Sequence, residues 1–261
     1  FSPGANAGDL AQQYGTLRAV EYAQPNYLRR FAVASNDSLF RQQWNLSRIG
    51  WTDVEPIDAS HLLVAVIDSG IDYRHPDIVD QMWTNEREVT GELGVDDDAN
   101  GYVDDFVGWD FTHAPGFAAQ GDYLDRDGDP MDESGHGTHV AGIIAATSDN
   151  EIGIAGVANG VKIMPLRAGF NLGASGFLED DDIAAAIVYA ADNGADILNM
   201  SWGDPQFSPL IRDVIRYAHG RGCVLVAAAG NDGSDQVFYP AKLEETIAVG
   251  ASGSGDIVPA F

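Results

Sequence analysis

Short apolar runs alternate along the chain with longer segments in which apolar positions recur at helical spacing. The runs predict strands at residues 62–67, 161–166, 197–200, 223–229 and 246–249, the first of them buried. The helical spacing predicts helices at about 136–145, 178–192 and 208–219. Repeated strand and helix units favour an α/β fold with three layers, in which helices cover both faces of a parallel sheet.

Three of these elements begin or end at a polar residue whose side chain can transfer a proton or form hydrogen bonds to a reacting group. The first apolar run ends at Asp68, and the run at 223–229 breaks into Gly230 and Asn231. A third element is the helix that begins at His136, where flanking glycines remove side-chain bulk. Because open α/β sheets place their sites at the carboxyl ends of strands, we expect Asp68, His136 and Asn231 to meet.

An acid, an imidazole and an amide have complementary roles in acyl transfer. An imidazole titrates near neutrality and can move a proton, and a carboxylate can hold its ring in place. An amide can donate a hydrogen bond to a developing oxyanion. Taken singly, His136 could be a structural residue at a helix start and Asn231 an ordinary turn residue. The combination favours a catalytic site.

The segments D-S-G at Asp68, H-G-T-H-V-A-G at His136 and A-A-A-G-N ending at Asn231 together resemble the subtilase family of serine endopeptidases. The segment from Asn36 to Phe40, followed by Gln42-Gln43-Trp44, resembles the mature start of the family's thermitase branch. The resemblance runs from about residue 33 to the end of the chain. It implies that Asp68 orients the imidazole, that His136 is the general base and then the general acid, and that Asn231 lines the oxyanion hole.

The family's nucleophile lies in a G-T-S-M-A type motif, and no such motif occurs before Phe261. We therefore expect residues 33–261 to be a catalytic domain that is incomplete at its C-terminus. The nucleophilic serine would lie beyond this chain, and the chain alone would be inactive.

Residues 1–32 resemble the C-terminal part of the inhibitory propeptide that precedes such domains. The pattern at 14–23 alternates enough to predict a strand, and Gln24-Pro25-Asn26-Tyr27 predicts an extended tail. Such a tail could lie in the substrate cleft as an intramolecular inhibitor. A strand extension without an inhibitory role is the alternative, and the processing point would fall between Tyr27 and Asn36.

Two loops resemble the family's substrate walls. Residues Ala174, Ser175 and Gly176 would pair with the peptide backbone, because small residues let it approach closely. The pocket for the residue before the scissile bond would be flanked by Ser201, Trp202, Gly203, Ala228 and Gly230. Trp202 is larger than the residue usual in the family, which leaves the breadth of the pocket open. Plain turn glycines are the alternative.

Clusters of acids and other oxygen donors suggest calcium, a hard cation that binds six to eight oxygens. The resemblance implies a strong site from Asp37, Asp77, Asn150 and the carbonyls of Thr147, Ile152 and Ile154. It implies a second site from Asp110, Asp125, Asp127, Asp129 and the Met131 carbonyl, for which a solvated acidic loop is the alternative. A third segment, residues 96–105, matches the start of a calcium-binding loop but lacks that loop's final glutamate. An ion could still be enclosed there by Asp96, Asp98, Asn100, the Tyr102 carbonyl and Asp104 or Asp105.

The charge balance narrows the possible partners. The chain has 40 acidic residues against 14 Lys and Arg, a formal net charge of -26, which excludes a nucleic-acid binder. No run of about eighteen apolar residues occurs, so we expect no membrane span. The single cysteine, Cys223, allows no intrachain disulfide. The resemblance to subtilases implies a secreted protein that acts on protein or peptide substrates, and we expect it to be a monomer.

The leading hypothesis is a calcium-stabilised serine endopeptidase made as a precursor. A catalytically inactive, calcium-binding relative is the first alternative. The second is a metal hydrolase that uses His136 and His139 with Asp68, since histidines three apart share a helix face. The H-E-x-x-H arrangement of that chemistry is absent from the sequence.

Overall fold

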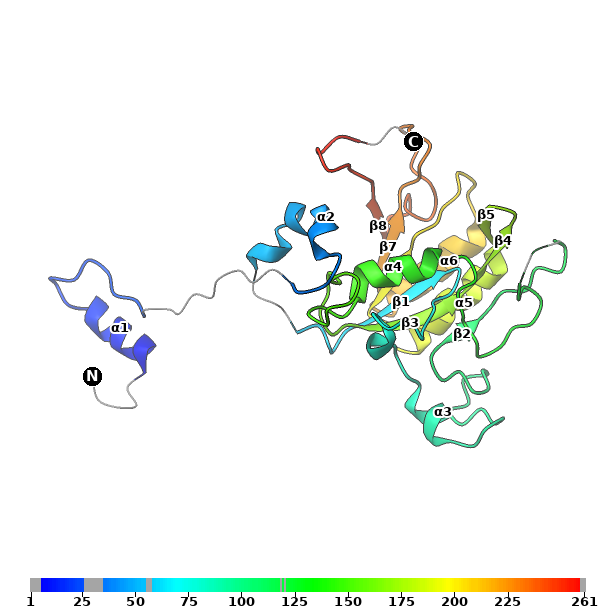
Figure 1. The fold of residues 1–261 in the computed structure, drawn as a ribbon, viewed down its shortest axis with the longest axis horizontal. Coiled ribbons are helices and arrows are strands. Elements are labelled where there is room, and N and C mark those ends of the chain that lie inside the picture. Colours follow the sequence, from blue (N-terminus) through cyan, green and yellow to red (C-terminus); the bar gives the residue numbers. More distant parts are fainter. Residues whose placement is uncertain (1–5, 26–34, 55–57, 118, 120, 259–261) are drawn as a thin grey trace. The chain divides into compact units, whose positions relative to one another are not determined.

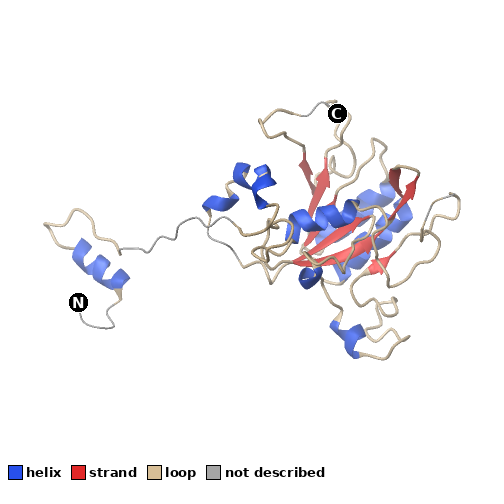
Figure 2. Cartoon of the chain, viewed as in Figure 1, coloured by secondary structure: helices blue, strands red, loops and turns tan. Residues whose placement is uncertain are grey.

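The computed structural model describes residues 6–25, 35–54, 58–117, 119 and 121–258. Contacts divide the chain into two compact units, Phe1–Val33 and Ala34–Phe261. Figures 1 and 2 show both units.

The first unit contains one helix, α1 (Ala7–Gly15), among its described residues. The helix begins at Asn6, whose side chain accepts hydrogen bonds from the backbone N–H groups of Gly8 and Asp9. The prediction of a strand at residues 14–23 is wrong, because that segment ends α1 and continues in turns. A strand needs a hydrogen-bonded partner, and the described part of this unit offers none. Of the predicted tail, Gln24 and Pro25 lie outside any helix or strand, and Asn26 and Tyr27 lie outside the described residues.

The second unit is built on a six-stranded sheet with the order β2-β3-β1-β6-β7-β8, in which every paired strand is parallel. The strands are β1 (Leu63–Asp68), β2 (Trp109–Asp110), β3 (Lys162–Arg167), β6 (Ile197–Met200), β7 (Val224–Ala228) and β8 (Thr246–Val249). The strand order reverses direction between β1 and β6, so the carboxyl end of β1 borders the point where such sheets form their clefts.

Helices cover both faces of this sheet, as Figures 1 and 2 show. The helix α4 (His136–Ala145) packs on one face through Ala141 and Ala145, against Val64 and Val66 of β1. The helices α5 (Asp180–Asp192) and α6 (Pro209–Gly220) pack on the other face, which carries Ala65 and Ile67. Successive residues of β1 therefore serve opposite cores, as the period of two in a strand requires. The predicted three-layer α/β fold is confirmed.

Smaller elements decorate this frame. They are α2 (Trp44–Arg48), α3 (Glu86–Thr90), the 3-10 turns Phe40–Gln42, Trp51–Asp53 and Val79–Gln81, and an antiparallel pair formed by β4 (Gly169–Leu172) and β5 (Ser175–Leu178). No helix in the described part of the chain combines the length and the apolar character that a membrane crossing requires.

Candidate active site

The centre of the site is a hydrogen bond between the tip of β1 and the first turn of α4. The Nδ1 atom of His136 lies 2.7 Å from the Oδ1 atom of Asp68. The Asp68 side chain is buried at 4% exposure, whereas the His136 side chain is 53% exposed. The second carboxylate oxygen of Asp68 is buried and has no hydrogen-bond partner among the described residues. A buried acid therefore holds one edge of an imidazole whose other edge reaches solvent.

Two glycines permit this approach of helix to strand. At Gly137 a side-chain Cβ would collide with the carbonyl oxygen of Gly70 and crowd the Cβ of Asp68. At Gly135, the residue that precedes α4, the backbone has φ of 87°, which favours glycine. Gly137 thus permits the close packing of α4 on β1, and Gly135 permits the turn through which the chain enters α4.

The environment of His136 favours its protonated form. The hydrogen bond to Asp68 is the largest cause of a raised pKa, and the charges of Asp68 and Asp132 act in the same direction. Partial burial opposes them by penalising the charged ring. Because the raising contributions win, an imidazolium formed during a proton transfer is stabilised in place.

Both partners line a cavity of about 630 Å³ at the carboxyl ends of β1, β6 and β7. The sequence-predicted residues Asn231, Ala174, Gly176, Ser201, Trp202, Gly203, Ala228 and Gly230 line the same cavity. Ser175 lies in β5, where it pairs with Leu172 of β4, and is not part of the lining. The structure therefore brings the predicted acid, imidazole, amide and substrate walls to one cleft.

Trp202 takes a position that its size alone did not predict. Its indole Nε1 donates to the carbonyl oxygen of Ile67, at 2.9 Å, and its ring packs against the core between the sheet, α5 and α6. The polar edge of the ring is thereby satisfied inside the protein, beside the strand tip that carries Asp68.

The histidines of α4 face different surroundings. The ring of His136 lines the cleft, whereas His139 lines a second cavity of about 510 Å³ with His75 and Asp72. Among the described residues, His136, His139 and Asp68 do not form a group that could hold a metal ion. The geometry that the metal hydrolase hypothesis requires is therefore not present.

The segments of the first predicted calcium site lie together. Asp37 and Asp77 are buried, at 5% and 2% exposure. Asp37 accepts from the backbone N–H of Asn150, and Asp77 accepts from the Asn150 side chain and from the N–H of Ile154. The N–H of Thr147 donates to the Asp77 carbonyl, and the N–H of Ile152 donates to the Asn150 side-chain oxygen. Two buried carboxylates from separate segments therefore meet at the 147–154 loop, and carboxylate oxygens are of the kind that calcium binds.

The residues of the second predicted site have other partners. Asp110 forms a buried ion pair with Arg167 at 3.1 Å, and burial raises the Asp110 pKa to about 7 against the guanidinium's opposing effect. Asp129 accepts from the Tyr73 hydroxyl, and Asp127 accepts from the N–H of Asp129. Asp125 joins no acidic cluster among the described residues. The structure does not bring the four predicted acids together into a cluster that could hold a cation.

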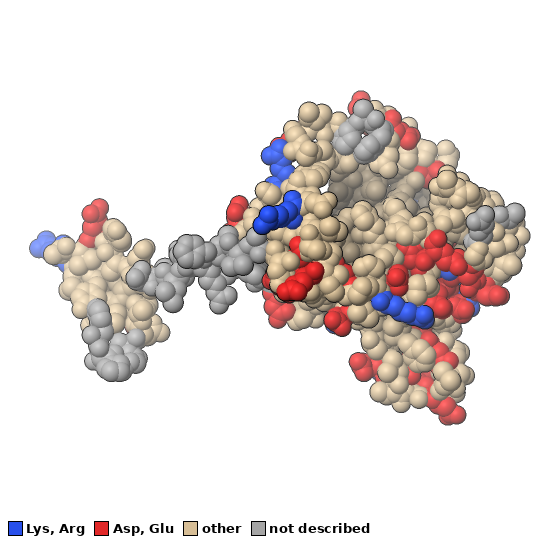
Figure 3. All heavy atoms as spheres, viewed as in Figure 1, with Lys and Arg blue, Asp and Glu red and all other residues tan. Residues whose placement is uncertain are grey.

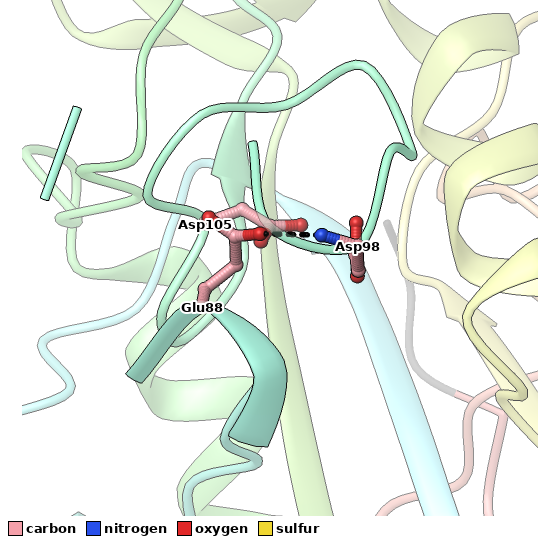
Figure 4. A group of neighbouring side chains, drawn as sticks. All are labelled: Glu88, Asp98 and Asp105. Atoms are coloured by element: carbon pink, nitrogen blue, oxygen red, sulfur yellow. Dashed lines mark hydrogen bonds between the residues drawn. The ribbon is translucent and has the colours of Figure 1, made fainter. Parts of the chain in front are cut away.

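The third predicted site is assembled differently from the expectation. Carboxylate oxygens of Glu88, Asp98 and Asp105 lie within 4.8 Å of one another. Figure 4 shows the three residues together, with a hydrogen bond from the backbone N–H of Asp98 to the Glu88 carboxylate. This is the one acidic cluster in the described part of the chain that could hold a metal ion. The Asn100 amide contacts both Asp98 and Asp105.

The other residues predicted for the third site lie outside this cluster. Asp96 and Asp104 turn away to accept from the N–H groups of Gly101 and Gly94. The Tyr102 ring packs edge-on against Trp109, Phe111 and Tyr189.

Sequence reasoning missed several residues that organise these sites. Glu88 lies in α3, outside the acidic run, and only its acidic character at a helix start could have drawn attention to it. Asp132 lies four residues before His136 and accepts hydrogen bonds from the loop between them. Asp132 and Ser134 lie just before the helix, and such residues are a recognisable N-terminal signal.

In this α/β protein a parallel sheet carries an acid at the tip of β1, and the acid pairs with an imidazole in the first turn of α4. Comparison with known proteins identifies the family. The profile described as "Subtilase family" matches residues 59–260. The chain belongs to the subtilase family.

Curated relatives match over most of the chain. The thermophilic serine proteinase of Bacillus sp. (strain AK1) is 38% identical over 245 residues, 93% of this chain and 52% of that protein. Halolysin of Haloferax mediterranei is 33% identical over 240 residues, 89% of this chain and 39% of that protein. The chain therefore spans about half or less of the length of these two relatives.

A solved structure agrees with the fold. The structure, described as that of proteases from the bacterium Pseudoalteromonas arctica, superposes with a TM-score of 0.66 at 27% identity, over 85% of this chain and 67% of that one.

Proposed function

We propose that the whole protein is a serine endopeptidase in which Asp68 and His136 activate a serine that follows residue 261 in the full-length protein. The observation that carries this proposal is the hydrogen bond of 2.7 Å between Asp68 and His136 in the wall of the cleft. The names of the relatives, which include a serine proteinase, support it.

The proposed reaction is acyl transfer from a peptide to serine and then to water. Asp68 accepts the Nδ1–H of His136, which leaves Nε2 able to take the proton of the attacking hydroxyl. His136 then gives that proton to the departing amine. Asn231 donates a side-chain hydrogen bond to the oxyanion that forms at the scissile carbonyl. Water completes the cycle with His136 again as base.

The test is hydrolysis of a peptide anilide by the protein expressed from its full reading frame in calcium buffer. We expect hydrolysis that a serine-directed inhibitor abolishes, and none for the His136→Ala variant. A folded, calcium-loaded protein without hydrolysis would favour the inactive calcium-binding relative instead.

Calcium is the cofactor that we propose. Asp37, Asp77 and Asn150 would hold one ion, with carbonyls of the 147–154 loop. A second ion would lie among Glu88, Asp98 and Asp105. Carboxylate and amide oxygens in buried turns support this choice. Bound ions would neutralise charge and hold surface loops, without a part in the chemical steps.

Residues 1–32 would inhibit the enzyme before processing. The resemblance of this segment to a propeptide supports the proposal. A peptide of residues 1–32, added to processed enzyme, should inhibit competitively. A scrambled peptide of the same composition is the control, and equal inhibition by both would contradict a specific role.

We further propose that the protein is secreted and monomeric. The chain is strongly acidic, and Figure 3 shows Asp and Glu far outnumbering Lys and Arg on one face. Like charges oppose self-association. We expect to recover the protein from the culture medium with the mass of a monomer. Retention of the protein in the cells would contradict secretion.

A further inference from the structure

One carboxylate outside the proposed catalytic set has an unusual number of partners. Oδ1 of Asp132 accepts hydrogen bonds from the Ser69 hydroxyl and the N–H groups of Ser134 and Gly135, at 2.8–2.9 Å. Oδ2 accepts from the N–H and the hydroxyl of Thr138, at 2.9 and 2.6 Å. A carboxylate with five donors is strongly fixed, because each is a charge-assisted bond.

These donors come from both segments that carry the proposed catalytic pair. Ser69 follows Asp68 at the tip of β1, and its hydroxyl oxygen also accepts from the N–H of Gly137, at 3.0 Å. Thr138 lies in the first turn of α4, and its hydroxyl accepts from the N–H of Asp72, at 2.8 Å. Asp132 therefore joins the residue after the acid to the residues on both sides of the histidine.

The Asp132 carboxylate caps the N-terminus of α4. Gly135 precedes α4 and has no side chain with which to cap it. Asp132 satisfies the N–H of Thr138 and places a negative charge at the helix's positive end.

We propose that Asp132 is a positioning residue for the peptidase reaction, holding β1 and α4 in the register that directs His136 at Asp68 on one side and at the cleft on the other. This inference rests on the proposed function. In this proposal Asp132 does not contact the substrate. Orientation of reacting groups is worth large rate factors, so a small loss of register should be visible in kcat.

The test compares Asp132→Asn with Asp53→Asn in the protein expressed from its full reading frame. Both changes remove one negative charge, but Asp53 is exposed and its carboxylate accepts no hydrogen bond among the described residues. Asn at 132 has nearly the same shape, yet its amide nitrogen cannot accept from Thr138. We expect kcat per titrated active site to fall at least tenfold for Asp132→Asn with KM within twofold, and the acid limb of the pH profile to move to lower pH. Asp53→Asn should match the wild type.

Ser69→Ala provides a second variant that keeps the charge of Asp132. It removes the bridge from Asp132 to β1 and the acceptor of the Gly137 N–H, so kcat should fall while Asp132 still accepts from Thr138. If Asp132→Asn and Ser69→Ala are folded by circular dichroism and both keep kcat within twofold with an unchanged acid limb, the positioning role is wrong.

A readout that needs no activity separates this inference from the proposed function. The Nδ1–H proton between His136 and Asp68 should give a downfield proton NMR signal that His136→Ala removes. Asp132→Asn should weaken it through faster exchange with water, whereas Asp53→Asn should not. A wild type with the signal but no hydrolysis would refute the proposed function alone, and an unchanged signal in Asp132→Asn would refute the positioning role.

Discussion

The Asp68 carboxylate is almost fully buried, and its partner His136 is half exposed. This asymmetry matters at the scale of single residues, since burial keeps the acid fixed while exposure lets the ring meet a substrate. The acid raises the pKa of the imidazole mainly through their hydrogen bond. The pair can therefore stabilise a positive charge that appears only during reaction.

Replacing Asp68 with Asn should test this pair in the full-length enzyme. The amide cannot hold the same tautomer of His136, so kcat should fall on the order of 10⁴-fold. The acid limb of the activity profile should also move to lower pH, because the main cause of the raised pKa is gone. Activity at the wild-type level, with the limb unmoved, would contradict the assigned role.

The same pKa shift predicts a pH dependence of stability. Because the folded pKa of His136 is raised, its protonation stabilises the folded state fully below the unfolded value of about 6.5. This contribution is lost as pH rises through the folded pKa. The difference in unfolding free energy between wild type and His136→Gln, measured by urea titration, should shrink across that range.

At the scale of elements, α4 lies so close to the β1 tip that only glycine fits at 137. Gly142 lies in the same helix, and a Cβ there would meet only Ile154 at 3.9 Å. The two positions provide a matched pair in one element.

Gly137→Ala should cost about 1–3 kcal/mol of unfolding free energy and move His136 away from Asp68, since the clash is with backbone. Gly142→Ala should be neutral or stabilising by up to about 1 kcal/mol, because Ala is the better helix former. Urea unfolding measures both. Equal behaviour of the two variants would show that the close packing at 137 is unimportant.

Helices and strands could be predicted from the sequence where the local hydrophobic pattern agrees with the tertiary structure. The strands at 197–200 and 246–249 have the predicted bounds, because each short run of mainly apolar residues has a neighbouring strand to pair with. Burial is not the reason at 246–249, since this edge strand is mostly exposed. The expected strand at 14–23 failed because alternation over a few residues does not supply a pairing partner. Asp68 and Asn231 were predictable because each follows an apolar strand. Asp132 and Glu88 were not, because the hydrophobic pattern does not show which segments the loops bring together.

At the scale of the whole molecule, 40 acids against 14 Lys and Arg impose self-repulsion. Part of this charge is gathered at Glu88, Asp98 and Asp105, which lie within 4.8 Å of one another. The sequence pointed to Asp98 and Asp105 but not to Glu88, which comes from α3, while Asp96 and Asp104 accept from backbone N–H groups of turns instead. A run of acids does not reveal which carboxylates converge.

Calcium should raise the melting temperature by several degrees, since an ion at 100 times its Kd contributes about 2.7 kcal/mol. Chelation should reverse the rise. Asp98→Asn should show a smaller rise than wild type, and Glu92→Gln, at an exposed position in the same region, should show the full rise. Melting curves with and without calcium measure this, and identical behaviour of all three proteins would exclude an ion at this cluster.

The most direct test of the central claim is labelling of the full-length, calcium-loaded protein with a fluorophosphonate probe, followed by mass spectrometry of the modified peptide. The account predicts one labelled serine, located after residue 261, and loss of labelling in His136→Ala. A folded wild type that takes up no probe, or labelling that persists without His136, would contradict it.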